Sequence, residues 1–164
     1  MRLNRIISFG CFLVGIGCHA VSPTTPPSDV VPISTAQVTD VQQITINAAE
    51  IAKEHGDYKE ALNLFKEVLK QNPVATDALI GIGDICLIEK QWNKAEPAFA
   101  RAVQLEPRNF DAQYGHGVSL QMMKKYIDAV RAYHRALTIN PDDVGANMNI
   151  ATTYLQMSRP QSAL

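Results

Sequence analysis

Residues 76–109 read TDALIGIGDICLIEKQWNKAEPAFARAVQLEPRN, and residues 110–143 read FDAQYGHGVSLQMMKKYIDAVRAYHRALTINPDD. The two segments carry matching residue types at matching places, which indicates an internal repeat of 34 residues. Four pairs show the match most clearly: Gly83 with Gly117, Ala95 with Ala129, Phe99 with Tyr133, and Pro107 with Pro141.

The same period extends toward both ends of the chain. Small, aromatic and proline residues recur every 34 positions: Ala49, Gly83, Gly117 and Ala151; Tyr58, Trp92 and Tyr126; Ala61, Ala95, Ala129 and Ala163; Phe65, Phe99 and Tyr133; Val68, Ala102 and Ala136; Pro73, Pro107 and Pro141. Between them, apolar residues are spaced by three and four, which favours helices over strands. The sequence therefore predicts an all-α fold in which each unit is a pair of antiparallel helices closed by its proline.

Seven helices follow from this pattern. We predict them at residues 40–55, 58–71, 76–89, 92–105, 110–123, 126–139 and 144–157. Thr39 or Asp40 is expected to cap the first of these helices. Gly56 fits the turn inside the first unit, but Lys90 and Lys124 stand at the same place in later units. A positive φ at either lysine would be strained, because both have a Cβ atom.

This pattern resembles the tetratricopeptide repeat family, and the resemblance covers about three quarters of the chain. It implies an α-solenoid, a stack of helix-turn-helix units, over residues 39–164. The units are 42–75, 76–109, 110–143 and a partial fourth at 144–164. Arrays of this family hold other proteins, so the resemblance implies a protein or peptide partner and no enzymatic activity of the array itself.

In this family, certain positions of the first helix of each unit face a concave surface that takes extended peptides. The resemblance therefore implies a peptide groove formed by Ile46, Glu50, Asp77, Ile80, Asp84, Asp111, Tyr114, Val118, Met148 and Thr152. Gln43, Lys53 and Leu87 map to the same face, and the family's Lys and Asn carboxylate clamp is absent. The alternative is that this face is only a solvated side of the helices.

The residue types on this face suggest a class of ligand. Acidic side chains beside apolar ones favour a peptide that carries Lys or Arg next to an apolar anchor. Tyr114 is expected to contribute most of the affinity, since aromatic residues dominate interface energetics. Asp84 is expected to contribute mainly to the salt dependence of binding.

The N-terminal residues differ from the repeats. Arg2 and Arg5 precede an uncharged apolar run of 12 residues, Ile6 to Gly17. A basic start and a short apolar core are typical of a secretory signal peptide, and the run is too short to span a bilayer as a helix. We therefore predict a signal peptide at residues 1–17, with a buried or membrane-associated helix as the alternative.

The residues around Cys18 suggest how the mature chain begins. Gly17-Cys18 resembles a bacterial lipoprotein processing site, although Gly15 replaces the usual leucine. The alternative is ordinary cleavage after Ala20. Residues 18–38 contain four prolines and are predicted to be a disordered tether. The sequence thus predicts an exported, lipid-anchored protein of the bacterial cell envelope, with a secreted or periplasmic soluble protein as the alternative.

Residues with catalytic or metal-binding chemistry do not form a recognisable motif in this sequence. The net charge of −1 argues against a nucleic-acid partner. His116 is expected to be bonded to a neighbouring backbone group at the edge of the core, and Cys86 to be an inert core thiol. We expect no cofactor, no metal and no small-molecule substrate.

Two functions remain open from the sequence. One is a scaffold of the cell envelope, tethered by lipid, which presents its groove to a protein partner and helps to assemble a pilus or outer-membrane machine. The other is an N-terminal interaction domain of a larger enzyme, such as a glycosyltransferase. A cytosolic co-chaperone fits less well, because of the signal segment and the missing clamp.

The lipoprotein hypothesis makes a direct prediction about the mature N-terminus. Mass spectrometry of membrane extracts should find Cys18 as the first residue, carrying lipid. A free N-terminus at Val21 would contradict this prediction and support ordinary secretion.

Overall fold

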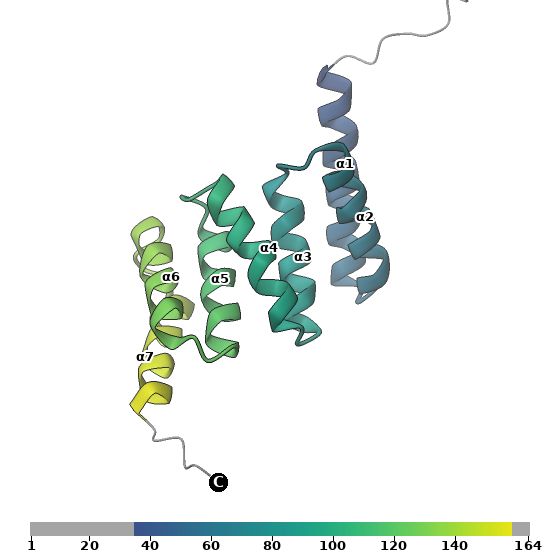
Figure 1. Ribbon diagram of the computed structural model, residues 1–164. Coiled ribbons are helices and arrows are strands. Elements are labelled where there is room, and N and C mark those ends of the chain that lie inside the picture. The colour runs from purple at the N-terminus through teal and green to yellow at the C-terminus, as the bar shows by residue number, and fades with distance from the viewer. Residues whose placement is uncertain (1–34, 159–164) are drawn as a thin grey trace, which may run out of the picture. The chain divides into compact units, whose positions relative to one another are not determined.

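The computed structural model describes residues 35–158, and these form seven α-helices in antiparallel pairs (Figure 1). The helices are α1 (Thr35–Glu54), α2 (Tyr58–Gln71), α3 (Thr76–Ile88), α4 (Trp92–Leu105), α5 (Phe110–Met122), α6 (Tyr126–Ile139) and α7 (Val144–Ser158). We call α1, α3, α5 and α7 the A helices, and α2, α4 and α6 the B helices. The predicted all-α fold of helix-turn-helix repeats is confirmed.

The predicted helix bounds agree with the structure except at the first helix. α2, α4 and α6 have the predicted bounds, while α3, α5 and α7 differ by one residue at their C-terminal ends. α1 begins at Thr35, so residues 35–38 belong to this helix and not to a tether. Thr39 and Asp40 lie within the helix, and the prediction that one of them caps it was wrong. The predicted signal peptide, Cys18 and the rest of the tether lie outside the described residues.

Helix starts and turns follow local chemistry. The Asn109 side chain accepts a hydrogen bond from the backbone N–H of Ala112 at 3.0 Å and caps α5. Gly56, Lys90 and Lys124 have φ values of 84°, 58° and 62°. Both lysines therefore have a positive φ, and each carries the steric strain that glycine avoids.

An aromatic ring on each B helix fixes the distance between helices. Phe99 on α4 is fully buried, and its ring lies against Gly83 on α3 and Gly115 on α5. A Cβ atom at Gly83 would lie 2.6 Å from the ring, and a Cβ at Gly115 would also overlap it. The ring therefore fits between two A helices only because neither glycine has a side chain.

The junction between the third and fourth units is polar instead. Tyr133 occupies the place of Phe99, and its hydroxyl donates a 2.7 Å hydrogen bond to Oε1 of the buried Gln121. The Gln121 amide donates in turn to Gln156 at 3.2 Å. Burial raises the pKa of Tyr133 well above its usual value, so the hydroxyl stays protonated and can donate.

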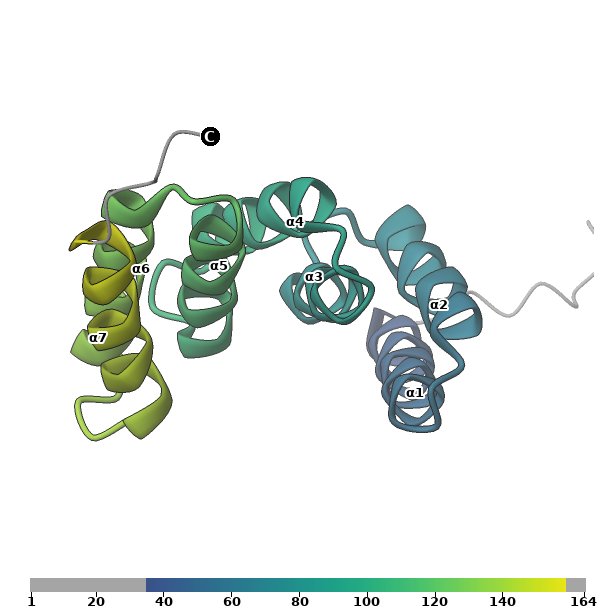
Figure 2. The ribbon, with the colours of Figure 1, turned by 90° about the horizontal axis from the view of Figure 1, so that it is seen from below.

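The A helices lie on the inner side of an arch. Each A helix contacts the A helix of the next unit, whereas the Cα atoms of successive B helices lie more than 8 Å apart within residues 35–158. Figure 2 shows α1 and α3 along the inner side of the arch and α2 and α4 along its outer side. The inner surface is therefore formed by the A-helix positions that the family resemblance assigns to a groove.

The buried alanine that recurs in each B helix should not tolerate a larger side chain. Ala95 is fully buried in a cluster with Phe99 and Cys86. Ala95→Leu should lower the free energy of unfolding by about 1–3 kcal/mol, because the helices have no room for a larger side chain. Thermal denaturation should show a lower melting temperature. The exposed neighbour provides the control, since Lys94→Leu should change the free energy by about 0.5 kcal/mol or less. An unchanged midpoint for Ala95→Leu would mean that the helices do not cross at this alanine.

Candidate functional site

A concave groove of about 480 Å³ lies across α1, α3 and α5. Eight of the ten predicted groove residues contribute to its walls: Ile46, Glu50, Asp77, Ile80, Asp84, Asp111, Tyr114 and Val118. Gln43, Asn47, Lys53, Leu87, Asn109 and Gly115 complete the walls. Met148 and Thr152 lie on α7, one unit beyond the groove, and are not part of it. The 34-residue period therefore brings the predicted residues of the first three units together.

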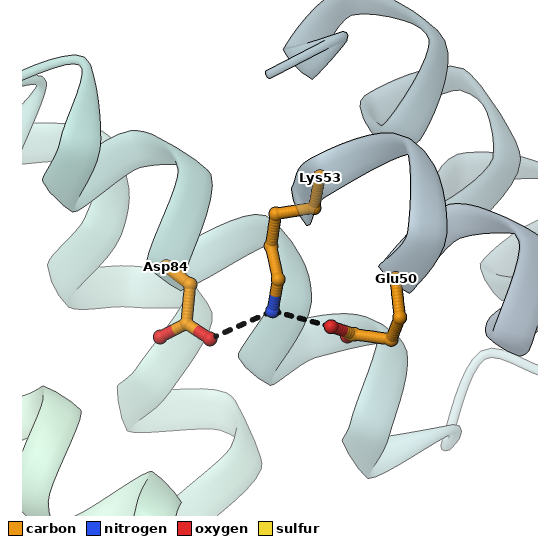
Figure 3. A network of polar contacts seen from close by, with 3 residues as sticks. All are labelled: Glu50, Lys53 and Asp84. Atoms are coloured by element: carbon orange, nitrogen blue, oxygen red, sulfur yellow. Dashed lines mark hydrogen bonds and ion pairs between the residues drawn. The ribbon is translucent and has the colours of Figure 1, made fainter. Parts of the chain in front are cut away.

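A lysine in the groove bridges two carboxylates. Nζ of Lys53 lies 2.6 Å from Oε2 of Glu50, one turn earlier on α1, and 3.3 Å from Oδ2 of Asp84 on α3 (Figure 3). The Lys53 side chain is 17% exposed, while the two carboxylates are each 39% exposed. This triad links the first unit to the second and places the only lysine of the groove between two acids.

Burial and the ion pairs act against each other in the triad. For Lys53, burial lowers the pKa, but the hydrogen bond to Glu50 and the charge of Asp84 outweigh it and raise the pKa above the usual value. For Asp84, burial raises the pKa of the carboxyl above its usual value, although the Lys53 charge opposes this. Lys53 is therefore a firmly protonated counter-ion, and its charge is already shared between two acids.

Two other carboxylates of the groove are free of such a partner. Asp77 and Asp111 occupy the first turns of α3 and α5, and both are exposed. Neither forms an ion pair with another described residue. The groove thus has four carboxylates and one ammonium group, and the unpaired negative charge lies at Asp77 and Asp111.

The apolar part of the groove contains an aromatic side chain held on several sides. The Tyr114 ring stacks on Phe110 at a centroid distance of 5.8 Å and is tilted against Tyr133 at 5.8 Å. Its hydroxyl accepts a hydrogen bond from the Asn149 side chain at 3.0 Å. Because its neighbours fix its orientation, Tyr114 would lose little conformational entropy on binding a ligand.

Two tetratricopeptide repeat models match this chain, one over residues 46–109 and another over residues 111–143. Together they span more than half of its 164 residues. The chain belongs to the tetratricopeptide repeat family. The repeats and the groove described above are therefore those of a tetratricopeptide repeat domain.

The proteins that are similar to this chain in sequence are much longer than it is. The General transcriptional corepressor trfA of Dictyostelium discoideum is 29% identical over 115 residues, covering 70% of this chain and 8% of that protein. The probable UDP-N-acetylglucosamine–peptide N-acetylglucosaminyltransferase SPINDLY of Petunia hybrida is 28% identical over 131 residues, covering 79% of this chain and 14% of that enzyme. The chain thus spans a small part of the curated relatives that it matches.

Solved structures share the fold at low sequence identity. The first tetratricopeptide domain of Spaghetti (RPAP3), bound to the HSP90 peptide SRMEEVD, superposes with a TM-score of 0.70 at 17% identity, covering 72% of this chain and 94% of that one. The Sgt2 tetratricopeptide domain of Aspergillus fumigatus gives 0.67 at 17% identity, covering 75% of this chain and 87% of that one. Identities this low establish the fold alone.

Sequence reasoning missed the role of Lys53. The residue maps to the concave face, and the i, i+3 spacing from Glu50 was a visible signal for one ion pair. The second pair, to Asp84, lies 31 residues away in sequence and depends on how α1 packs against α3. The bridge could therefore be recognised only in the structure of the tetratricopeptide domain.

His116 on α5 lies outside the groove. Its Nε2 is 3.6 Å from Oε1 of Glu96 on α4, and neither ring nitrogen forms a hydrogen bond. The expected backbone hydrogen bond was therefore wrong. Burial lowers the pKa of His116, although the nearby Glu96 opposes this. Cys86 is 5% exposed, and burial raises the pKa of its thiol, which agrees with an inert core residue.

Two further properties of residues 35–158 concern metal ions and membranes. These residues place no three His, Cys, Asp or Glu side chains where they could hold a metal ion together. In the same part of the chain, every helix is too short or too polar to cross a membrane.

The buried imidazole predicts a loss of stability in acid. The pKa of His116 is lower in the folded state than the ordinary value of 6.5. Its neutral form therefore stabilises the fold above pH 6.5, and this contribution is lost as the pH falls through the folded-state pKa. Urea denaturation near pH 7 and near pH 5 should show that His116→Leu loses less stability than the wild type. The exposed His134 supplies the control, since His134→Leu should behave like the wild type. Equal losses in His116→Leu and the wild type would show that another group is responsible.

Proposed function

We propose that this protein is a scaffold whose concave groove binds an extended segment of a partner protein. The observation that supports it most is the groove itself, in which the fixed Tyr114 lies beside unpaired carboxylates. A pre-organised aromatic side chain in a concave surface is the usual anchor of a protein interface. The partner's segment would be extended, because the A-helix residues form a continuous surface across three units.

The charge of the groove determines which peptides fit it. The HSP90 peptide bound to the RPAP3 domain contains three acidic residues. In the present groove the only lysine is already shared by Glu50 and Asp84, and Asp77 and Asp111 repel a negative ligand. The proposed partner of this protein therefore does not resemble that acidic peptide.

The second part of the proposal concerns the location of the scaffold. The basic start, the apolar run at residues 6–17 and the Gly17-Cys18 pair support export and a lipid anchor in a bacterial envelope. Attached in this way, the scaffold would recruit subunits of a pilus or of outer-membrane machinery. Export without lipid would give a secreted or periplasmic soluble protein with the same groove.

A second candidate function is the interaction domain of a larger enzyme. It is favoured by the similarity to the SPINDLY protein of Petunia hybrida, which is named as a glycosyltransferase and of which this chain covers 14%. Reading the gene beyond the codon for Leu164 separates the two candidates. A long catalytic domain there would favour the enzyme, and a stop codon the scaffold.

Substitution of Tyr114 tests whether the groove binds the partner. Affinity capture from an envelope extract, with residues 35–164 as bait, should retain a protein whose affinity falls by about 2 kcal/mol or more with Tyr114→Ala. Tyr154→Ala is the matched control, because Tyr154 is 52% exposed on α7 and lies outside the groove. Circular dichroism must show that both variants are folded. If the partner binds Tyr114→Ala like wild type but not Tyr154→Ala, α7 is the binding surface and the proposal is wrong.

A further inference from the structure

The residues that face the groove form rows that run across the A helices. The middle row is apolar and contains Ile46, Ile80 and Tyr114, which are 34 residues apart. One flanking row contains Gln43, Asp77 and Asp111, and the other contains Glu50, Asp84 and Val118. A ligand that lies across the helices therefore meets an apolar row with carboxylates along both sides.

The spacing of this row limits the backbone conformation of a ligand. Successive A helices are in contact, and packed helices have axes about 8–10 Å apart. A polyproline II segment has three residues per turn and rises about 3.1 Å per residue, so its side chains return to the same side every 9 Å or so. In a β-strand, by contrast, a residue three positions further along the chain points to the opposite side. Polyproline II geometry therefore brings an apolar residue to each A helix.

The charges of the two flanking rows determine the other residues of the ligand. Asp77 and Asp111 lie on one side without a cationic partner among the described residues. On the other side, Lys53 offsets only one of the two negative charges of Glu50 and Asp84. A ligand with basic residues between its apolar ones would gain attraction mainly on the Asp77 and Asp111 side. An acidic ligand could use Lys53 only by displacing two carboxylates.

We propose that the groove binds a proline-rich basic segment in polyproline II conformation, with an apolar residue at every third position. This inference rests on the proposed function and specifies the ligand of the same groove. The apolar residues lie on Ile46, Ile80 and Tyr114, and Lys or Arg side chains between them lie toward Asp77 and Asp111.

Three synthetic nonapeptides test the spacing and the charge. The first consists of three Leu-Pro-Lys repeats, and the second of three Leu-Pro-Glu repeats. The third has the composition of the first, with its three leucines adjacent. In fluorescence anisotropy titrations, the first peptide should bind residues 35–164 about tenfold more tightly than either of the others. If the second peptide binds as tightly as the first, the proposed preference for basic residues is wrong. If the third binds as tightly as the first, the proposed spacing is wrong. If the first does not bind, the inference as a whole is wrong.

Variants of the domain assign the attraction to named carboxylates. The double substitution Asp77→Asn with Asp111→Asn should weaken binding of the Leu-Pro-Lys peptide about three- to tenfold and reduce its salt dependence. Asp57→Asn with Asp142→Asn is the matched control, since both residues are exposed and lie outside the groove. Equal affinities of the two double variants would contradict the role of Asp77 and Asp111.

Substitution of Lys53 separates a ligand-binding effect from a structural one. Lys53→Gln removes the internal counter-ion, so the Leu-Pro-Lys peptide should bind about threefold more tightly, although the domain itself becomes less stable. Weaker binding by this variant in its folded state would contradict the proposed charge arrangement.

The captured partner tests the proposed function independently of the peptide experiments. If it depends on Tyr114 while the Leu-Pro-Lys peptide does not bind, the inference fails and the proposed function stands. If the partner ignores Tyr114, the proposed function fails.

Discussion

The insertion of a B-helix ring between two A helices is the constraint on which this structure depends. Phe99 can lie between α3 and α5 only because Gly83 and Gly115 have no Cβ atoms to overlap its ring. The same contact recurs where Phe65 meets Gly81. These contacts determine how closely successive A helices pack, and so they also determine the spacing of the residues that the A helices present to the groove. The core of the repeat and the geometry of its concave surface therefore have one physical cause.

The C-terminal junction shows what happens when that constraint changes. Asn149 stands where the repeat places Gly81 and Gly115, and Tyr133 stands where it places Phe99. The Tyr133 ring still lies against Gly117 on α5, but on the α7 side it meets a residue that has a side chain. Hydrogen bonds compensate: Tyr133 donates to Gln121, and Asn149 donates to the Tyr114 hydroxyl. A polar junction of this kind stabilises one relative position of the helices, since its groups are costly to leave unpaired. The hydrogen bond from Asn149 also fixes the orientation of Tyr114, the aromatic side chain of the groove.

The sequence predicts most of this architecture because each position of the 34-residue repeat occurs in several units, so an atypical residue in one unit does not obscure the pattern. The helix bounds from α2 onward follow from position within the repeat, and the eight groove residues of the first three units follow from the resemblance to the tetratricopeptide repeat family. Features without a counterpart in other units were not predictable in this way. The start of α1 at Thr35 was missed because Thr39 and Asp40 have cap-forming side chains that also occur within helices. The neighbours of His116 and Lys53, by contrast, were missed because Glu96 and Asp84 reach them through packing between helices.

The triad of Glu50, Lys53 and Asp84 argues against a groove that is merely a solvated side of the helices. On such a surface a lysine extends into water, whereas the Lys53 side chain is 17% exposed and held between acids from α1 and α3. Partial burial of an ammonium group costs free energy that only well-placed partners can offset. An ion pair on a fully solvated surface would contribute little to stability, but the pair of Lys53 and Asp84 joins two units and holds their side chains in place. Tyr114 is fixed in the same way by Phe110 and Asn149. A surface whose charged and aromatic side chains are ordered before any ligand arrives loses less entropy on binding, and that is the physical property that distinguishes a binding groove from an ordinary helix face.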